Sequence, residues 1–345
     1  MDALVKYGLV DGQVEIRQTE EPECPSDRVL IGVRAAGVCG SDVHLWRNHQ
    51  SWEINLPLVL GHEFSGEVLA VGADVDGVAP GDRVTCETAA KVCGRCGYCL
   101  GGAYNLCPNR LGYGALIDGA FTDIVVARPE ILHPLPDAVS WEHAALTEPG
   151  CVAYNALVEK TDVRAGDLVV VQGPGPIGIM ALQIARIQGA GTLVVLGTGA
   201  DQARLDIAAE LGADHVINVE EEDPHTLVRS LGDGFGADLV VDCTGHSAAL
   251  QSGMEMVRPN GQITKIGWGP QPLDFNLDPL VQKAVTLQGC FSHTFATWER
   301  VLTLLQTGQL NLDPVIGGLY PLTDWHEAFS AMESGASVKS VLVWN

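Results

Sequence analysis

The stretch Asp167-Leu168-Val169-Val170-Val171-Gln172-Gly173-Pro174-Gly175-Pro176-Ile177-Gly178 decides the fold. An apolar, β-branched run leads directly into the spacing G-x-G-x-x-G, and a helix-period segment continues to about Gln188. In such a strand–turn–helix context the first Gly makes the turn, the second lets the backbone approach a pyrophosphate, and the third lets helix and strand pack closely. The helix N-terminus then faces the phosphates. The motif predicts dinucleotide contacts at Gly173, Gly175, Pro176, Ile177 and Gly178; an ordinary Gly-rich turn is the alternative.

Beyond this motif, strand-like and helix-like segments alternate. Such alternation predicts a doubly wound parallel sheet with right-handed crossovers. The predicted strands are 192–196, 215–218, 237–242 and 262–266, and the predicted helices are 201–211, 224–231 and 247–257.

Residues 1–150 have a different character, with short β-like runs separated by Gly and Pro. This pattern predicts a small β-rich unit. A helix at 295–306 and an apolar run at 340–344 follow the alternating region, and we expect part of this tail to return to the N-terminal unit. The β-like runs include 29–33, 66–71, 82–85 and 123–126.

The segment Leu196–Asp201 follows the second predicted strand, where a carboxylate usually binds the adenosine ribose. Gly197 or Gly199 stands at that position, and the nearest carboxylate, Asp201, could serve only to cap the next helix. Thr198 and Arg204 are candidate cofactor contacts, although Arg204 could instead be an exposed helix residue. NAD and NADP therefore both stay open.

Composition limits the function classes. The chain has 345 residues, which suggests two domains at about 150 residues each, and 46% hydrophobic residues are enough for real cores. Its formal charge of −23 argues against a nucleic-acid or anionic-membrane partner, because both need a basic surface. No secretory signal and no apolar run of about 18 residues is visible, so we expect a soluble, cytoplasmic protein.

Four of the ten cysteines form the pattern C-x2-C-x2-C-x7-C at Cys93, Cys96, Cys99 and Cys107. Four thiolates on a Gly-rich loop can surround Zn²⁺ tetrahedrally, and a site without an open position is structural rather than catalytic. A disulfide knot is the alternative, which an intracellular protein of this size disfavours. The isolated cysteines are predicted to be small buried hydrophobic residues: Cys24, Cys86, Cys151, Cys243 and Cys290.

A second candidate metal site has its ligands spread along the chain. Cys39 lies in Gly37–His44, His62 and Glu63 lie in Gly61–Gly66, and Glu148 lies in Thr147–Gly150. Thiolate, imidazole and carboxylate groups are all good zinc ligands, and three of them plus water make an open site. Spacing alone does not bring this set together.

With these motifs in place, the chain resembles the zinc-containing medium-chain alcohol dehydrogenases over nearly its whole length. The signature Gly61-His62-Glu63-x2-Gly66-x5-Gly72-x2-Val75, the four-cysteine segment and the nucleotide motif occur in the family's order. Cys39–Asp42, Thr147–Pro149 and, loosely, 291–298 are similar to its polyol (sorbitol-type) and threonine dehydrogenase branch.

The resemblance implies an α/β architecture. A GroES-like β-rich catalytic domain is expected at 1–150 with a zinc lobe at 86–110, and a Rossmann NAD(P)-binding domain at 151–290. Residues 291–345 would return to complete the catalytic domain. The resemblance also implies a homodimer or homotetramer that pairs through the edge of the nucleotide-domain sheet.

It further implies roles for single residues. The catalytic zinc is held by Cys39, His62 and Glu63 or a water, with Glu148 as a direct or exchangeable ligand. Glu63 could instead orient the site, and Glu148 could be only a charge at a helix N-terminus. Ser41 and His44 match the positions that relay the alcohol proton, with a helix cap and a surface histidine as alternatives. Candidate pocket walls are Trp46, Phe291 and His293, with a place in the hydrophobic core as the alternative for each.

The implied reaction is hydride transfer from a secondary alcohol, such as a polyol, a sugar or a related diol, to NAD or NADP. One catalytic and one structural Zn²⁺ per chain are expected. L-threonine 3-dehydrogenase or a butanediol-type dehydrogenase is the alternative, and a non-catalytic binding protein of this fold is a distant one. The expected partner is a small-molecule alcohol, with no nucleic acid and no membrane.

Overall fold

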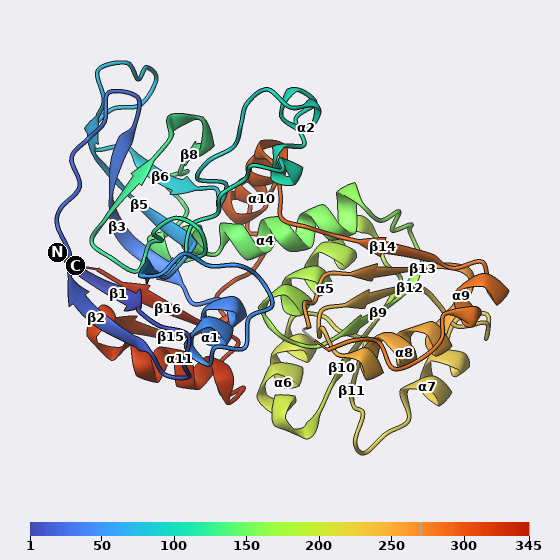
Figure 1. Cartoon of the computed structure of the whole chain (residues 1–345). Coiled ribbons are helices and arrows are strands. Elements are labelled where there is room, and N and C mark those ends of the chain that lie inside the picture. Colours follow the sequence, from blue (N-terminus) through green and yellow to red (C-terminus); the bar gives the residue numbers. More distant parts are fainter. Residues whose placement is uncertain (270, 345) are drawn as a thin grey trace.

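The computed structural model describes residues 1–269 and 271–344. Two bodies lie side by side, with helices α4 (Thr147–Tyr154) and α10 (Phe295–Gln306) between them (Figure 1). One hydrophobic cluster spans the junction, because it contains Ala35 and Val341 of one body, Val169 of the other and Trp298 of α10.

The first body is built on a seven-stranded sheet in the order β15-β16-β3-β5-β6-β8, with β7 also paired to β3. The late strand β16 runs antiparallel to the early strand β3, and Val341 lies opposite Gly37. Helix α11 (Trp325–Glu333) contacts both β16 and α1 (Gly40–Trp46). The strands are β3 (Val29–Gly37), β5 (Glu63–Val71), β6 (Arg83–Cys86), β7 (Ile124–Ala127), β8 (Leu132–Pro134), β15 (Ile316–Pro321) and β16 (Lys339–Val343).

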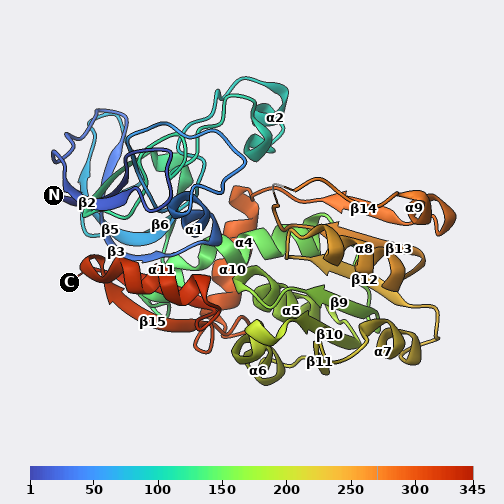
Figure 2. The ribbon, with the colours of Figure 1, turned by 60° about the horizontal axis from the view of Figure 1, so that its bottom comes forward.

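A smaller sheet in the order β2-β1-β4 covers this body next to both chain ends (Figure 2). Its first two strands form an antiparallel pair in which Leu4 lies opposite Ile16. The strands are β1 (Asp2–Lys6), β2 (Val14–Gln18) and β4 (Leu58–Val59).

The second body contains a six-stranded sheet in the order β11-β10-β9-β12-β13-β14, and every pairing is parallel. The chain proceeds outward from β9 in both directions, so a topological switch point lies beside β9, where open α/β sheets bind ligands. The predicted doubly wound sheet is confirmed. Its strands are β9 (Leu168–Gln172), β10 (Thr192–Gly197), β11 (His215–Asn218), β12 (Ala237–Asp242), β13 (Val257–Lys265) and β14 (Thr286–Gly289).

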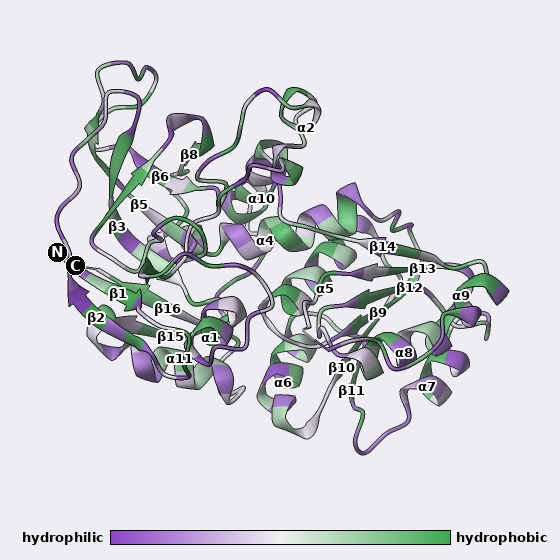
Figure 3. Ribbon diagram, in the orientation of Figure 1, coloured by the Kyte–Doolittle hydropathy of each residue, from purple (hydrophilic) through white to green (hydrophobic). Residues whose placement is uncertain are grey.

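Helices cover both faces of this sheet, and the central strands are its most apolar part (Figure 3). All residues of β9 are buried, as a strand covered on both faces requires. Strand β13 begins at Val257, earlier than the predicted residue 262, because Val257 already pairs with Ala237. The helices are α5 (Pro176–Gln188), α6 (Gln202–Glu210), α7 (Pro224–Ser230), α8 (Ser247–Met256) and α9 (Asp278–Gln282).

Further helical segments complete the described chain. The helix α3 (Trp141–Ala145) precedes α4, and a π-helical turn, Asn155–Glu159, extends α4 at its other end. Within residues 1–269 and 271–344, no helix is both long and apolar enough to cross a bilayer.

Candidate active site and metal centres

Three of the predicted zinc ligands meet at one end of the seven-stranded sheet. Cys39 caps the N-terminus of α1, and Glu63 is the first residue of β5, directly after His62. One ligand atom of each residue lies within 4.8 Å of the other two. The antiparallel pairing of β3 with β5, which sets Gly37 opposite Glu63, brings these distant segments together.

Asp42 holds the two ligand loops in place. Its buried carboxylate accepts hydrogen bonds from the backbone N–H of Cys39 at 2.8 Å and of Gly61 at 3.3 Å. It also lies 3.8 Å from His62 Nδ1. Burial lowers the pKa of His62, but the hydrogen bond with Cys39 and the Asp42 carboxylate outweigh it and raise the pKa to about 10. Asp42 was missed in the sequence, although its place three residues after Cys39 is that of a capping-box acid.

Glu63 forms a buried ion pair with Lys339, the first residue of β16. The Lys339 ammonium donates a hydrogen bond to Oε1 at 2.7 Å and lies 2.6 Å from Oε2, which accepts no hydrogen bond. Burial raises the pKa of the Glu63 carboxyl, and the charge of Lys339 opposes this rise. The role of Lys339 was not predictable from the sequence, because the contact joins residues 276 positions apart.

Glu148 lies beside this group but is not one of the three residues whose ligand atoms converge. It is buried in the first turn of α4, and its Oε1 lies 3.1 Å from Nε2 of the buried His293. The Trp298 indole N–H donates to His293 Nδ1 at 2.7 Å. Since an indole can only donate, Nδ1 is the acceptor, and His293 carries its proton on Nε2, facing Glu148. Burial raises the pKa of Glu148, but the hydrogen bond with His293 and the charges of His293, His62 and Lys339 together outweigh this effect and lower the pKa.

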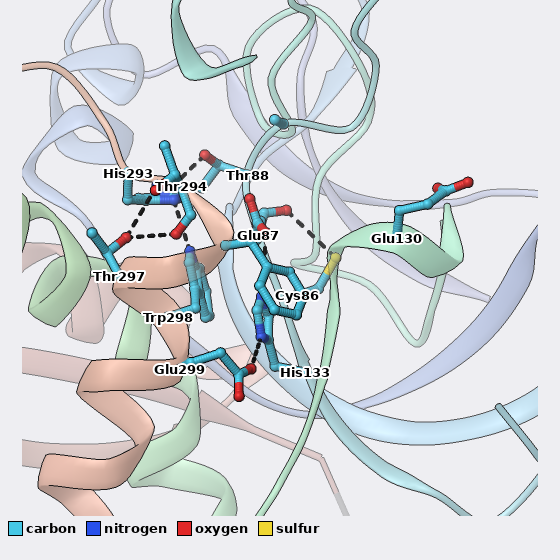
Figure 4. Close-up of polar contacts among 12 residues, drawn as sticks. Cys86, Glu87, Thr88, Glu130, His133, His293, Thr294, Thr297, Trp298 and Glu299 are labelled. Carbon is cyan, nitrogen blue, oxygen red and sulfur yellow. Dashed lines mark hydrogen bonds and ion pairs between the residues drawn. The ribbon is translucent and has the colours of Figure 1, made fainter. Parts of the chain in front are cut away.

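A second polar network, which includes Glu87, His133 and Glu299, lies beside Trp298 (Figure 4). The buried Glu87 accepts hydrogen bonds from the Tyr104 hydroxyl at 2.7 and 2.8 Å and lies 3.2 Å from His133 Nε2. His133 Nδ1 lies 2.6 Å from Glu299, and the His133 ring stacks on Trp298. The Trp298 indole thus stacks on the His133 ring and donates its N–H to His293, and these two contacts fix its orientation.

The proposed relay residues lie on α1. Ser41 occupies the first turn and is half-buried, and His44 lies on the exposed side. Partial desolvation of the ring, together with the nearby His49, lowers the pKa of His44. Trp46 is a core residue instead of a pocket wall, because it is buried against Trp325 and Phe329.

Phe291 lines a cavity of about 540 Å³ that also contacts Trp268 and the end of β13. The Trp268 ring lies 6.0 Å from the Phe291 ring and 5.6 Å from the ring of Trp52. Trp52 belongs to the first body and Trp268 to the loop after β13, so this aromatic contact crosses between the two bodies. His293, in contrast, is buried beside Glu148.

The four clustered cysteines converge on a loop that contains the short helix α2 (Gly97–Leu100). Their sulfur atoms lie within 4.8 Å of one another, and all four thiols are free. Backbone N–H groups point at these sulfurs, including that of Cys96 toward Cys93 at 3.3 Å and that of Cys99 toward Cys96 at 3.4 Å. The N–H groups of Arg95 and Cys96 lower the pKa of Cys93 to about 6. The backbone N–H groups therefore favour a thiolate at Cys93, whereas desolvation and the neighbouring cysteines raise the pKa of Cys99 to about 12.

The nucleotide motif forms one wall of a cavity of about 920 Å³. Gly173 has a φ of 89°, which favours Gly, and a side chain at Gly178 would collide with the carbonyl of Gly173. Nothing lies within 4 Å of the position where Gly175 would carry a Cβ, so a ligand can approach this backbone. Gly175 caps α5, whose first turn contains Pro176, Ile177 and Gly178.

The second predicted cofactor segment lines the same cavity through Thr198, Asp201 and Arg204. The Thr198 hydroxyl donates to Asp201 at 2.9 Å, so Asp201 stabilises its own turn. Arg204 is not an exposed helix residue, because its guanidinium donates to the carbonyls of Ser337 at 2.9 Å and Met332 at 3.0 Å.

Comparison with known proteins agrees with this geometry. The model "Alcohol dehydrogenase GroES-like domain" matches residues 25–137, and "Zinc-binding dehydrogenase" matches 176–307. A sorbitol dehydrogenase of Halalkalibacterium halodurans is 41% identical over 99% of each chain. A D-arabitol-phosphate dehydrogenase of Enterococcus avium is 38% identical over 94% of this chain and 92% of its own. An L-threonine 3-dehydrogenase of Bacillus licheniformis is 35% identical over 93% of each.

Solved structures match over nearly the whole length as well. The alcohol dehydrogenase TADH from Thermus sp. ATN1 superposes with a TM-score of 0.90 at 32% identity over 99% of each chain. A zinc-binding dehydrogenase from Sinorhizobium meliloti 1021, solved with NADP, superposes with a TM-score of 0.89 at 26% identity over 99% of each chain. The chain therefore belongs to the zinc-containing medium-chain alcohol dehydrogenases, near their polyol and threonine dehydrogenase branch.

Proposed function

We propose that this protein is a zinc-dependent dehydrogenase that transfers a hydride from a secondary alcohol to NAD or NADP. A polyol, a sugar or a related diol is the proposed substrate. The observation that carries the proposal is the convergence of Cys39, His62 and Glu63 in a chain that also has a G-x-G-x-x-G turn on a large cavity. The named relatives act on sorbitol and arabitol phosphate, which supports a polyhydroxylated substrate.

The donor set fits zinc. Cys39 and His62 would hold the ion, and a carboxylate oxygen of Glu63 or a water would complete the protein side. A zinc ion bound there would supply a Lewis acid that lowers the pKa of the alcohol hydroxyl, and a bound nicotinamide nucleotide would supply the hydride acceptor. We propose the four-cysteine loop as a structural zinc site.

The remaining steps belong to the protein's own groups. The Ser41 hydroxyl receives the alcohol proton and passes it toward His44, whose lowered pKa keeps the imidazole neutral and able to accept it. His293 orients Glu148 beside the reacting alcohol, and Asp42 orients the loops of Cys39 and His62. Lys339 compensates the charge of Glu63.

The domain division, assembly and location are further proposals. We assign 1–150 with 291–345 to the catalytic domain and 151–290 to the nucleotide domain. Strand β14 pairs only with β13 in the described chain, and its outer edge is free to join a second copy. A cytoplasmic homodimer or homotetramer is proposed, and light scattering on the purified protein measures the assembly.

A second candidate function is oxidation of L-threonine or a butanediol, which the threonine dehydrogenase relative supports. Nucleotide reduction, followed by absorbance with zinc-loaded protein, should be measured with sorbitol, arabitol, arabitol phosphate, 2,3-butanediol and L-threonine, each with both nucleotides. We expect the highest kcat/KM with a polyol. Turnover of L-threonine alone would favour the second candidate, and no turnover of any secondary alcohol would overturn the proposal.

A further inference from the structure

One end of the nucleotide cavity is strongly acidic. The loop that follows β11 contributes Glu220, Glu221, Glu222 and Asp223 to its lining. Among the described residues that line the cavity, Arg204 is the only Arg or Lys. This end lies next to the turn after β10, where a Rossmann fold receives the adenosine ribose.

The turn after β10 has no carboxylate at the position where such folds usually place one. A side chain at Gly197 would be crowded, because a Cβ there would lie 3.0 Å from Pro174 Cγ and 3.1 Å from Asp201 Cβ. Asp201 is occupied within its own turn by hydrogen bonds from the backbone N–H and the hydroxyl of Thr198. Both of these hydrogen bonds fall on Oδ2, and the other oxygen, Oδ1, faces Arg204 Nη1 at 3.4 Å, so the acid of this turn is engaged by other groups of the protein.

Glu220, in the loop that follows the neighbouring strand β11, brings a carboxylate to this turn. Its Oε2 accepts a hydrogen bond from the backbone N–H of Gly199 at 2.9 Å. A Cβ at Gly199 would approach the same oxygen at 3.0 Å, so the glycine leaves room for the carboxylate. The backbone N–H of Glu220 in turn donates to the Asn218 side chain at 3.1 Å, which fixes the start of the loop.

The donor groups of Arg204 are engaged by other parts of the protein. Its Nε and Nη2 donate to the carbonyl of Ser337, Nη2 also donates to Met332, and Nη1 faces Asp201 at 3.4 Å. These contacts hold the guanidinium on the segment after α11.

We infer that Glu220 makes this protein selective for NAD over NADP. Its carboxylate lies where it accepts hydrogen bonds from the adenosine ribose hydroxyls, and it repels a 2′-phosphate, which carries about −1.5 to −2 charges at pH 7. Glu221, Glu222 and Asp223 add to the repulsion without sharing the contact with Gly199. The inference rests on the proposed nucleotide-dependent function and names the nucleotide.

Direct binding tests it. Dissociation constants for NADH and NADPH should be measured by the fluorescence of the bound dihydronicotinamide, without substrate, on the zinc-loaded protein. We expect NADPH to bind about 100-fold more weakly than NADH. Glu220→Gln retains an acceptor for the Gly199 N–H but removes the charge, and it should narrow that ratio about tenfold, mainly through tighter NADPH binding.

Asp206→Asn is the matched control, because it removes one charge from the exposed face of α6, outside the cavity lining. It should leave the ratio unchanged. Raising the salt concentration should narrow the ratio for the unmodified protein and have less effect on Glu220→Gln, because salt screens charge repulsion. Two results would overturn this inference but not the proposed function. One is equal affinity of the unmodified protein for NADH and NADPH. The other is a ratio of the two dissociation constants that is the same in Glu220→Gln as in Asp206→Asn. Binding of neither nucleotide would overturn the proposed function and this inference with it.

Discussion

The ammonium group of Lys339 lies within 2.7 Å of both carboxylate oxygens of Glu63, and neither side chain is accessible to solvent. Glu63 is next to the proposed zinc ligand His62, so this ion pair joins the metal site to the C-terminal strand. Burying either charge alone is costly, and the pair is retained because each compensates the other.

Lys339→Met should therefore destabilise the protein strongly. The substitution leaves Glu63 buried without a counter-charge, which costs about 3–5 kcal/mol of unfolding free energy. Urea unfolding of the metal-free protein measures the change, because a zinc ion at Glu63 would itself supply a counter-charge. Lys339→Arg, which keeps the charge, should lose much less, and an unchanged urea midpoint for Lys339→Met would contradict the role of the pair.

Metal analysis should find two zinc ions per chain, one for each convergent ligand group. Cys39→Ser should reduce the content to one, abolish turnover and leave the fold intact, because the open site is catalytic. Cys96→Ser should also lose one zinc but lower the melting temperature, because the closed site stabilises its loop. Full activity of Cys39→Ser would show that the catalytic site is elsewhere.

The pH profile of kcat/KM should reflect His44. Partial burial and His49 lower its pKa, so the neutral, proton-accepting imidazole persists to lower pH than in an ordinary histidine. The rate should fall only below that lowered pKa. His49→Gln removes one cause of the shift and should move the acid limb to higher pH, whereas His44→Gln should lose about tenfold or more at neutral pH. An acid limb unaffected by both substitutions would exclude His44 from the relay.

Trp298→Phe tests how Glu148 is held. Without the indole N–H, His293 is no longer restricted to the tautomer that donates to Glu148. We expect kcat to fall about tenfold with zinc content unchanged. Trp325→Phe, a loss of indole at the distant α1–α11 contact, is the control and should leave kcat as it is. Equal rates for the two variants would show that Trp298 only fills space.

The ion pair between Arg47 and Glu333 should give a small, pH-dependent contribution to stability. Both carboxylate oxygens of Glu333 lie 2.6 Å from the guanidinium, and the hydrogen bond lowers the pKa of Glu333. A lowered carboxyl pKa stabilises the fold above the unfolded pKa, and that stability is lost as the pH falls through the folded one. About a third of each side chain is exposed, so Glu333→Gln should cost about 0.5–1 kcal/mol near neutral pH and less in high salt. If the difference in unfolding free energy between Glu333→Gln and the unmodified protein persisted in strong acid, the ion pair with Arg47 would not be its cause.

Local patterns predicted most of the architecture. The helix expected at 295–306 is found as α10, because Thr294 and Thr297 cap its start, and the β9–α5 unit follows its glycine spacing closely. Both sets of proposed zinc ligands, the four clustered cysteines and the set around Cys39 and His62, were also identifiable, because their residue types and their order in the family are distinctive.

The partners of those ligands were not predictable from the sequence. Lys339 contacts Glu63, His293 contacts Glu148, and Glu220 contacts Gly199. In each pair the residues lie on different elements, and no periodicity of the sequence links them. The tertiary contacts of Arg204 and Trp46 were not predictable for the same reason. A helix residue has several possible neighbours, and only the packing of the C-terminal segment determines which one it contacts.

The position of β16 also determines the order in which the protein can mature. All strands of the nucleotide sheet lie in one continuous stretch, 168–289, so that half can fold during translation while the tail is still being made. The other half cannot: β3 lacks its neighbour, and Glu63 its counter-ion, until residues 339–343 have left the ribosome. We expect the nascent chain to acquire a nucleotide-binding half first and a stable metal centre only after synthesis of those residues.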